Sequence, residues 1–422
     1  MVEDTIISML QPRQDTVQAP SFADLTTMGV GGQIESFLCP TDRVGLIEAV
    51  EGADAQGQPL CVIGGGSNIL AADEAFSGLV VRDARREINV LDEAAPVEGQ
   101  DRSVHVAATA GTHWDDLVNY CVRMGLSGIE GLSGIPGTVG ASVVQNIGAY
   151  GQEVGQSVDT VEVWDRQLKV VQELNARQMS FGYRTSALKA TMYRAPGVPG
   201  VEFFPTPRYI VLSVTLVLRH SHTSRVDSDQ LAQALQVETG NLMPIEQIRD
   251  AVLAIRARKG MLEDPGRYQL SWMKGTRETS NIQAATEALH MSVIQQSGGT
   301  TECDIRTNRH SCGSFFMNPV LDQKKAAQLP PQAPQYQVLY QGRPSGTVKT
   351  SAAWLIDHAG FHKGFHLENS MAALSSVHTL ALTNRGGATA QHVYDLARTI
   401  QDGVEKTFGI RIIPEPVVIA QR

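Results

Sequence analysis

The chain has 422 residues, of which 42% are hydrophobic and 19% charged, an ordinary balance for a globular protein of two or three domains. The net charge of −9 argues against a basic surface that recruits nucleic acid, and no run approaches the roughly 18 apolar residues of a membrane helix. The N-terminus lacks a signal-peptide pattern, and five scattered cysteines favour a reducing compartment. We therefore expect a cytoplasmic protein without membrane insertion.

Short apolar runs alternate with helical patterns after a tail, residues 1–21, that we expect to be flexible. The sequence predicts helices over residues 46–57 and 113–125. It predicts strands over residues 59–70, 78–83, 103–111, 160–166, 168–174 and 209–220. This order indicates an α+β first half, roughly residues 22–222.

A polar stretch, residues 219–230, indicates a boundary before a second unit. Beyond it the sequence predicts helices over 244–260, 350–360 and 389–409, and strands over 379–384 and 410–420. Residues 266–310 are rich in Ser, Thr and Gln, and we interpret them as an insertion with one helix near 281–296. A flexible surface insertion is favoured over one that covers a binding site.

Three glycines end the predicted strand of "VIGGGSNIL", residues 62–70, and Ser67 and Asn68 follow them. Consecutive backbone N–H groups without Cβ atoms can form a nest for phosphate oxygens. Neither the G-x-G-x-x-G pattern of dinucleotide-binding folds nor the G-K-[ST] of a P-loop is present. A tight structural turn is an equally good reading of this stretch alone.

A second glycine-rich stretch, "GIEGLSGIPGTVGASVVQNIGAYGQEV", covers residues 128–154. Such a bare backbone costs conformational entropy, which is understandable if it lies against a large flat ligand. Gln145 and Asn146 could supply directional hydrogen bonds to that ligand. The alternative is a glycine-rich connector, but two such stretches in one α+β half favour a phosphate-bearing cofactor.

Five motifs occur in order: "GGGSNIL", "GIPGTVGASVVQNIGAYG", "FGYR", "GSFFMNP" and "IIPEP". Together they resemble the UDP-N-acetylenolpyruvoylglucosamine reductase family, over residues 22–420 except 266–310. The resemblance implies an FAD-binding domain of the vanillyl-alcohol-oxidase (PCMH) type over 22–222, in two subdomains split near residue 85. It also implies an α+β substrate-binding domain over 230–422 that carries the insertion 266–310.

The resemblance implies a non-covalent FAD, reduced by NADPH, and a UDP-linked enolpyruvyl amino sugar as substrate, in a monomer that serves peptidoglycan synthesis. Hydride would pass from FAD N5 to C3 of the enolpyruvyl group. The residues implied for cofactor binding are Gly64, Gly65, Gly66, Ser67, Asn68, Ala110, Gly111, Gly134, Ile135, Pro136, Gly137, Gly140, Ala141, Gln145, Asn146 and Gly148.

Three residues are implied in catalysis. Ser314 would protonate C2, with Phe315 and Phe316 excluding water. Arg184 would stabilise the charge that develops on the conjugated carboxylate, because a guanidinium presents paired donors. Glu415, between two prolines, would act beside Arg184 in charge stabilisation and proton management.

Substrate contacts are implied for Lys259, Asn318, His378 and Tyr183, with the lysine on the diphosphate. Tyr150 and Tyr183 lie in matching motifs and could instead serve packing. The sequence departs from the family at Met317, where lysine or threonine is frequent. It also lacks, in residues 224–231, the tyrosine that stacks on the nucleotide in some members, a departure for which the insertion 266–310 could compensate.

Other patterns are weaker. Cys303, His310 and Cys312 lack a fourth zinc ligand and a usual spacing, so a zinc site is not expected. The histidines 358, 362 and 366 are interpreted as a solvated face, because nearby glycines weaken a helix. Glu263 and Asp264 are expected to close a turn before Pro265. The alternative functions are another PCMH-type oxidase of alcohols or sugars, and a non-catalytic UDP-sugar or flavin-binding protein.

Overall fold

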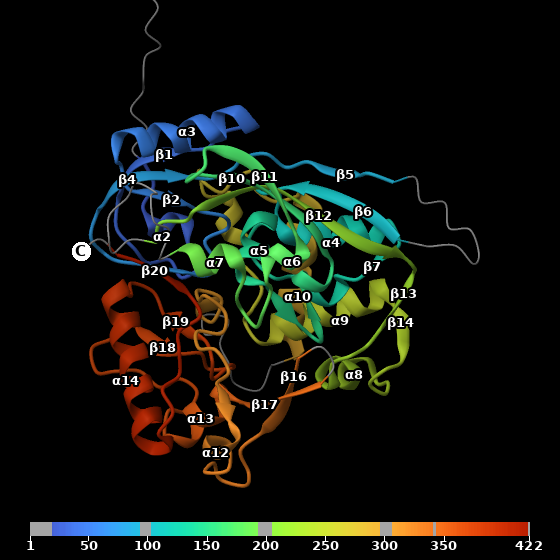
Figure 1. Ribbon diagram of the computed structural model, residues 1–422. Helices are drawn as coiled ribbons and strands as arrows, with labels where there is room; N and C mark the ends of the chain where they lie inside the picture. The colour runs from blue at the N-terminus through green and yellow to red at the C-terminus, as the bar shows by residue number, and fades with distance from the viewer. Residues whose placement is uncertain (1–18, 93–102, 193–204, 296–305, 341–342, 421–422) are drawn as a thin grey trace, which may run out of the picture.

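A small parallel sheet opens the fold in the computed structural model, which describes residues 19–92, 103–192, 205–295, 306–340 and 343–420. Its strands β1, β4 and β2 lie in that order and span Ile34–Leu38, Phe76–Val81 and Leu60–Val62. Helix α3, Arg43–Gln56, covers one face through Leu46 and Val50 (Figure 1). Asp42 begins this helix, because its carboxylate accepts a hydrogen bond from the Gly45 N–H at 2.8 Å.

A larger antiparallel sheet follows, in the order β11-β10-β12-β6-β5, and β7 also pairs with β12. The side chains of β12 alternate between buried and half-buried, as expected of a strand between two layers. Helices α4 and α5 pack on the face that holds the main apolar core of this half. The strands are β5 Ile88–Val90, β6 Ser103–Thr109, β7 Leu126–Ser127, β10 Val158–Asp165, β11 Val170–Asn175 and β12 Tyr209–His220; the helices are α4 Trp114–Arg123 and α5 Val139–Gln145.

Several short elements complete the first half, and some of them border the glycine-rich stretches. They are α2 Phe22–Leu25, β3 Ile69–Ala71, η1 Glu130–Leu132, β8 Gly148–Ala149, β9 Gln152–Glu153, η2 Val154–Gln156, α6 Ala176–Met179 and α7 Ala187–Met192. Ser21 caps α2 through a reciprocal capping box with Asp24. Residues 1–18 of the expected tail lie outside the described part of the chain.

The middle segment packs against the first half of the chain. Its hairpin β13–β14 leads into α8 and α9, and α9 contacts α4, η1 and α10. The buried Arg249 of α9 pairs with the buried Asp115 of α4 at 2.7 Å. The elements are β13 Thr223–Arg225, α8 Asp229–Leu235, β14 Leu242–Pro244, α9 Ile245–Arg258, η3 Pro265–Gln269 and α10 Thr279–Gln295.

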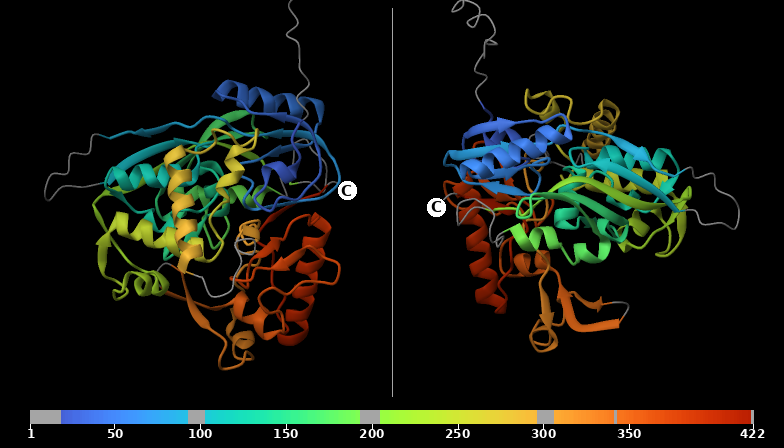
Figure 2. Two further views of the ribbon diagram at one scale, coloured as in Figure 1. Left: turned by 180° about the vertical axis from the view of Figure 1, so that it is seen from behind. Right: turned by 45° about the horizontal axis from the view of Figure 1, so that its top comes forward.

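The C-terminal elements, orange to red, form a layer with its own apolar core below the first half (Figures 1 and 2). The last strand returns to the first half, because β20 pairs in parallel with β3 at the register Val417–Ile69. The elements are β15 Val320–Asp322, α12 Gln323–Ala326, β16 Gln335–Tyr340, β17 Arg343–Thr350, α13 Ala352–His358, β18 Ala372–Leu374, β19 Leu382–Asn384, α14 Ala390–Phe408 and β20 Val417–Ile419.

Two local expectations need correction. The interpretation of 266–310 as a surface insertion is wrong for the part that the structure describes, because Arg267, Tyr268 and Arg277 are all less than 10% exposed. The predicted last strand shrinks to Val417–Ile419, since Pro414 and Pro416 have no N–H to donate to a sheet. The domain division at 222–230 stays a prediction.

Candidate active site

The two glycine-rich stretches lie backbone to backbone. A Cβ atom added at Gly65 would stand 2.6 Å from Cα of Gly137, and one added at Gly64 would stand 2.5 Å from Oγ1 of Thr138. Side chains at these positions would therefore push the stretches apart. Ser67 links them as well, because its hydroxyl donates to the carbonyl of Pro136 at 3.0 Å.

A cavity of about 1240 Å³, counting its open mouth, lies along these stretches between the two sheets of the first half. Within the described ranges, no acceptor pairs with the backbone N–H groups of Gly64–Asn68. Unpaired amides beside a largely apolar cavity suit the phosphates and the flat rings of a dinucleotide. The residues present therefore fit FAD.

Most of the residues predicted for cofactor binding line this cavity: Gly64, Gly65, Gly66, Ser67, Asn68, Ala110, Gly111, Gly140, Ala141 and Gln145. Ile135, Pro136 and Gly148 line a second cavity instead. Gly134, Gly137 and Asn146 line neither and support the walls. The Asn146 amide, for example, donates to the Gly182 carbonyl at 2.8 Å and accepts from the Gly155 N–H at 3.0 Å.

The second cavity, of about 1630 Å³, borders the first, because Ser67, Asn68, Thr138, Ala141 and Gln145 line both. Arg184, Ser314 and Glu415 lie in its wall, although they come from three distant parts of the chain. The β20–β3 pairing explains the position of Glu415, because the Val417 N–H donates to the Asn68 carbonyl at 2.9 Å.

Arg184 and Glu415 form the charged centre of the second cavity. Nε of Arg184 lies 3.3 Å from Oε1 of Glu415, and Nε2 of Gln145 donates to the same oxygen at 3.0 Å. Nη2 of Arg184 donates to the Gly148 carbonyl at 2.7 Å, which fixes the guanidinium. Lys189 contacts the other end of Gln145 at 2.7 Å, and burial lowers the pKa of this lysine. The sequence did not predict Lys189, because this residue lies in none of the motifs.

The position of Ser314 is fixed because the backbone next to it is hydrogen-bonded to the segment that carries Glu415. The Glu415 N–H donates to the Phe315 carbonyl at 2.8 Å, and Phe315 and Phe316 are buried in the C-terminal core. The hydroxyl of Ser314 lies 3.4 Å from Nε2 of His378. Burial, reinforced by Lys259 and Lys363, lowers the pKa of His378 to about 4, so this imidazole is neutral at pH 7.

The residues predicted for substrate contact are partly brought together. Lys259, Asn318 and His378 line the second cavity, whereas Tyr183 does not line it, and its ring contacts the cations of Arg184 and Lys349. Tyr150, which lies in one of the motifs, also lines this cavity. The cavity contains further residues that the motifs did not indicate: Ser228, Gln230, Arg256 and Arg309. Arg256 precedes Lys259 by one helical turn, and this spacing could have revealed it.

The structure offers no support for the patterns set aside above. Among the described residues, which exclude Cys303, no group of His, Cys, Asp and Glu could hold a metal ion. Burial raises the pKa of Cys312 to about 12, and its thiol donates to the Ile69 carbonyl. His358 and His362 are exposed, as expected. No described helix is long and apolar enough to cross a membrane.

Comparisons with known proteins agree with this geometry. The model of the "FAD binding domain" family matches residues 34–173, so this part of the chain is an FAD-binding domain and the expected α+β fold is confirmed. The model "UDP-N-acetylenolpyruvoylglucosamine reductase, C-terminal domain" matches residues 304–419.

Relatives match over nearly the whole chain. The UDP-N-acetylenolpyruvoylglucosamine reductase of Thermobifida fusca is 38% identical over 94% of this chain and 96% of its own. That of Cutibacterium acnes is 37% identical over 94% of this chain and 88% of its own. The crystal structure of the Thermus caldophilus enzyme has the same fold, with a TM-score of 0.51 at 23% identity over 95% of this chain and 98% of its own. The chain belongs to the UDP-N-acetylenolpyruvoylglucosamine reductase family.

Proposed function

We propose that this chain reduces the enolpyruvyl group of UDP-N-acetyl-3-O-(1-carboxyvinyl)-glucosamine with NADPH and gives UDP-N-acetylmuramate for peptidoglycan synthesis. The names of its relatives support the substrate. The observation that carries the proposal is the second cavity, in which Arg184, Ser314 and Glu415 meet beside the FAD cavity.

The charges of the second cavity suit an anionic substrate. Its wall contains the cations Arg184, Arg256, Lys259 and Arg309, against the anions Glu263 and Glu415. Lys259 donates to the neutral amide of Gln230 at 2.9 Å, and burial and Arg256 lower its pKa. A bound diphosphate would relieve the repulsion between the charges of Lys259 and Arg256, so these are the residues that we assign to the diphosphate.

When FAD is bound along the first cavity, it would supply a hydride for C3 of the enolpyruvyl group. Arg184 then faces the negative charge that develops at C2 and spreads into the carboxylate, which its paired donors stabilise. Glu415 and the Gly148 carbonyl hold the guanidinium in place. Ser314 donates a proton to C2, which completes the two-electron reduction of the double bond. His378, neutral beside this hydroxyl, orients it.

Anaerobic half-reactions test this proposal. NADPH should bleach the yellow flavin, and the enolpyruvyl substrate should then restore its colour. Bleaching by an alcohol and recovery with oxygen would instead identify an oxidase. Flavin binding without turnover of either kind would identify a binding protein.

We also propose a cytoplasmic monomer. Both cavities are built from one chain, so the site needs no partner subunit. The four described cysteines, Cys39, Cys61, Cys121 and Cys312, are free thiols, which is typical of a reducing compartment. Light scattering of the purified protein at micromolar concentration tests the monomer.

A further inference from the structure

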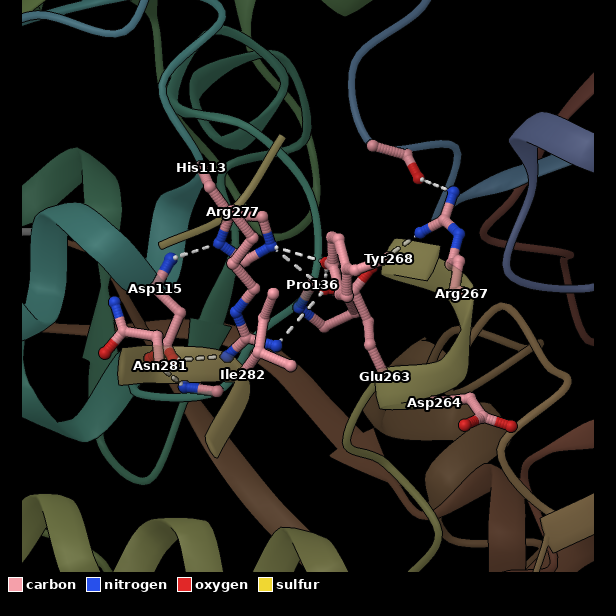
Figure 3. Close-up of polar contacts among 12 residues, drawn as sticks. His113, Asp115, Pro136, Glu263, Asp264, Arg267, Tyr268, Arg277, Asn281 and Ile282 are labelled. Carbon is pink, nitrogen blue, oxygen red and sulfur yellow. Dashed lines mark hydrogen bonds and ion pairs between the residues drawn. The ribbon is translucent and has the colours of Figure 1, made fainter. Parts of the chain in front are cut away.

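A buried cluster of charged residues lies behind the FAD cavity, where the segment 263–281 meets the start of α4 (Figure 3). It is separate from Arg184, Ser314 and Glu415. Every charged side chain in it is less than 10% exposed. We call it the ion cluster, and its members are His113, Asp115, Arg249, Glu263, Arg267, Tyr268 and Arg277.

Glu263 is the centre of one half of the ion cluster. Its Oε1 accepts from Nη1 of Arg267 at 2.6 Å, and its Oε2 contacts the Tyr268 hydroxyl at 2.6 Å and Nε2 of His113 at 3.0 Å. Burying charges is costly, and a buried ion pair is weak grounds for inferring stability. More informative are the backbone groups that these charged side chains bind, because those bonds fix the orientation of the peptides.

Arg267 reaches the first glycine-rich stretch. Its Nη2 donates to the Gly65 carbonyl at 2.7 Å and also to the Leu25 carbonyl. In a planar trans peptide the C=O and the following N–H point in opposite directions. With the Gly65 carbonyl directed to Arg267, the N–H of Gly66 is directed away from it. Both glycines line the FAD cavity, whereas Arg267 does not.

The same ion cluster holds the second glycine-rich stretch. Oδ1 of Asp115 accepts from the Gly134 N–H at 2.7 Å, while Arg249 and Arg277 neutralise this carboxylate. The N–H of Trp114 donates to the Gly137 carbonyl at 3.0 Å. Both walls of the cofactor site are therefore fixed from behind by one set of charges.

We propose that Arg267 is a positioning residue for FAD, which holds the Gly65–Gly66 peptide so that its amide faces the cofactor diphosphate. Arg267 lies outside residues 34–173 and 304–419, which the family models match. The segment 263–281 thus acts as a clamp that the FAD-binding domain lacks by itself. The inference concerns FAD binding and does not depend on the identity of the substrate.

Two matched variants test the proposal, Arg267→Met and Arg277→Met. Each removes one buried guanidinium from the ion cluster, but only Arg267→Met removes the bond to the Gly65 carbonyl. In Arg277→Met, Asp115 retains both contacts with Arg249. FAD is titrated into the apoproteins and followed by quenching of its fluorescence. The melting temperature of each apoprotein is measured in parallel.

We expect Arg267→Met to raise the Kd for FAD by about tenfold or more, the scale of one charge-assisted hydrogen bond. Arg277→Met should leave it within about threefold at a similar loss of melting temperature. An unaltered Kd in Arg267→Met, or an equal loss in both variants, would overturn the proposal.

Arg267→Lys keeps the inference testable if Arg267→Met does not fold. A lysine retains the charge but cannot present paired donors to Glu263 and Gly65 together. Its Kd for FAD should lie between those of the unchanged protein and Arg267→Met. If Arg267→Lys binds FAD as tightly as the unchanged protein, only the charge matters and the positioning role fails.

Discussion

Arg184 and Glu415 lie 3.3 Å apart between Nε and Oε1, although one lies between strands β11 and β12 of the larger sheet and the other precedes the last strand of the chain. The pair spans the junction of the FAD-binding half and the C-terminal layer. Both side chains are less than 20% exposed, so solvent screens the pair little. The wall of the second cavity is therefore complete only when β20, the strand that follows Glu415, pairs with β3.

The role of Arg184 predicts different effects on the two half-reactions. Arg184→Lys keeps the charge but loses the paired donors, so oxidation of the reduced flavin by substrate should slow by about 10²-fold or more. Reduction by NADPH should change much less. Stopped-flow absorbance of the flavin measures both rates. An unchanged rate of substrate reduction would contradict charge stabilisation by Arg184.

Ser314→Ala should separate the half-reactions further. A positioned general acid typically contributes about 10²–10⁴-fold, so the substrate half-reaction should slow by that factor while NADPH still bleaches the flavin. The Phe315 N–H donates to the Leu380 carbonyl through the main chain, so the variant should keep its fold. Normal recolouring of the reduced variant by substrate would remove Ser314 from the mechanism.

His378 predicts a pH dependence of stability. Its pKa falls from 6.5 to about 4 on folding, so the unfolded chain binds the proton more readily between these values. The stability contributed by the neutral imidazole is complete above about pH 6.5 and is lost as the pH falls toward 4. The free energy of unfolding, measured with urea, should therefore fall more steeply over this pH interval for the wild-type protein than for His378→Gln. Parallel curves would contradict a neutral, buried His378.

Local sequence motifs were enough to predict much of the site. The glycine runs at 64–66 and 134–140 predicted the two stretches that lie along the first cavity, because a bare backbone is a local property of sequence, and their contact with FAD stays a prediction. "GSFFMNP" and "IIPEP" indicated Ser314 and Glu415 by resemblance. Their meeting depends on the β20–β3 pairing, which no local pattern specifies.

The ion cluster could not be predicted in the same way. Residues 266–295 have a polar composition typical of a solvated surface, yet Arg277 and Asn281 are buried against Asp115 and Asp116 of α4. Whether a charge is buried depends on a partner, and these partners are far away in sequence. Glu263 was assigned to a turn for the same reason, and only its neighbour Asp264 caps one, at Gly266.

Glu263 provides the last prediction, because its carboxylate balances several buried cations. Hydrogen bonding to His113, together with the charges of Arg267 and Arg277, outweighs burial and holds the pKa of this carboxyl well below its ordinary 4.5. Glu263→Gln would leave those cations uncompensated, so the free energy of unfolding at pH 7 should fall by about 3–5 kcal/mol. Glu405→Gln removes a carboxylate from an exposed pair with Arg411 and should change the free energy of unfolding little.

The contribution of Glu263 to stability should also depend on pH. Because the folded pKa is depressed, this contribution is complete above pH 4.5 and is lost as the pH falls below it, so the difference in the free energy of unfolding between the wild-type protein and Glu263→Gln should narrow in acid. Equal effects of the two substitutions in urea unfolding at pH 7 would show that the ion cluster does not hold the segment 263–281 in place.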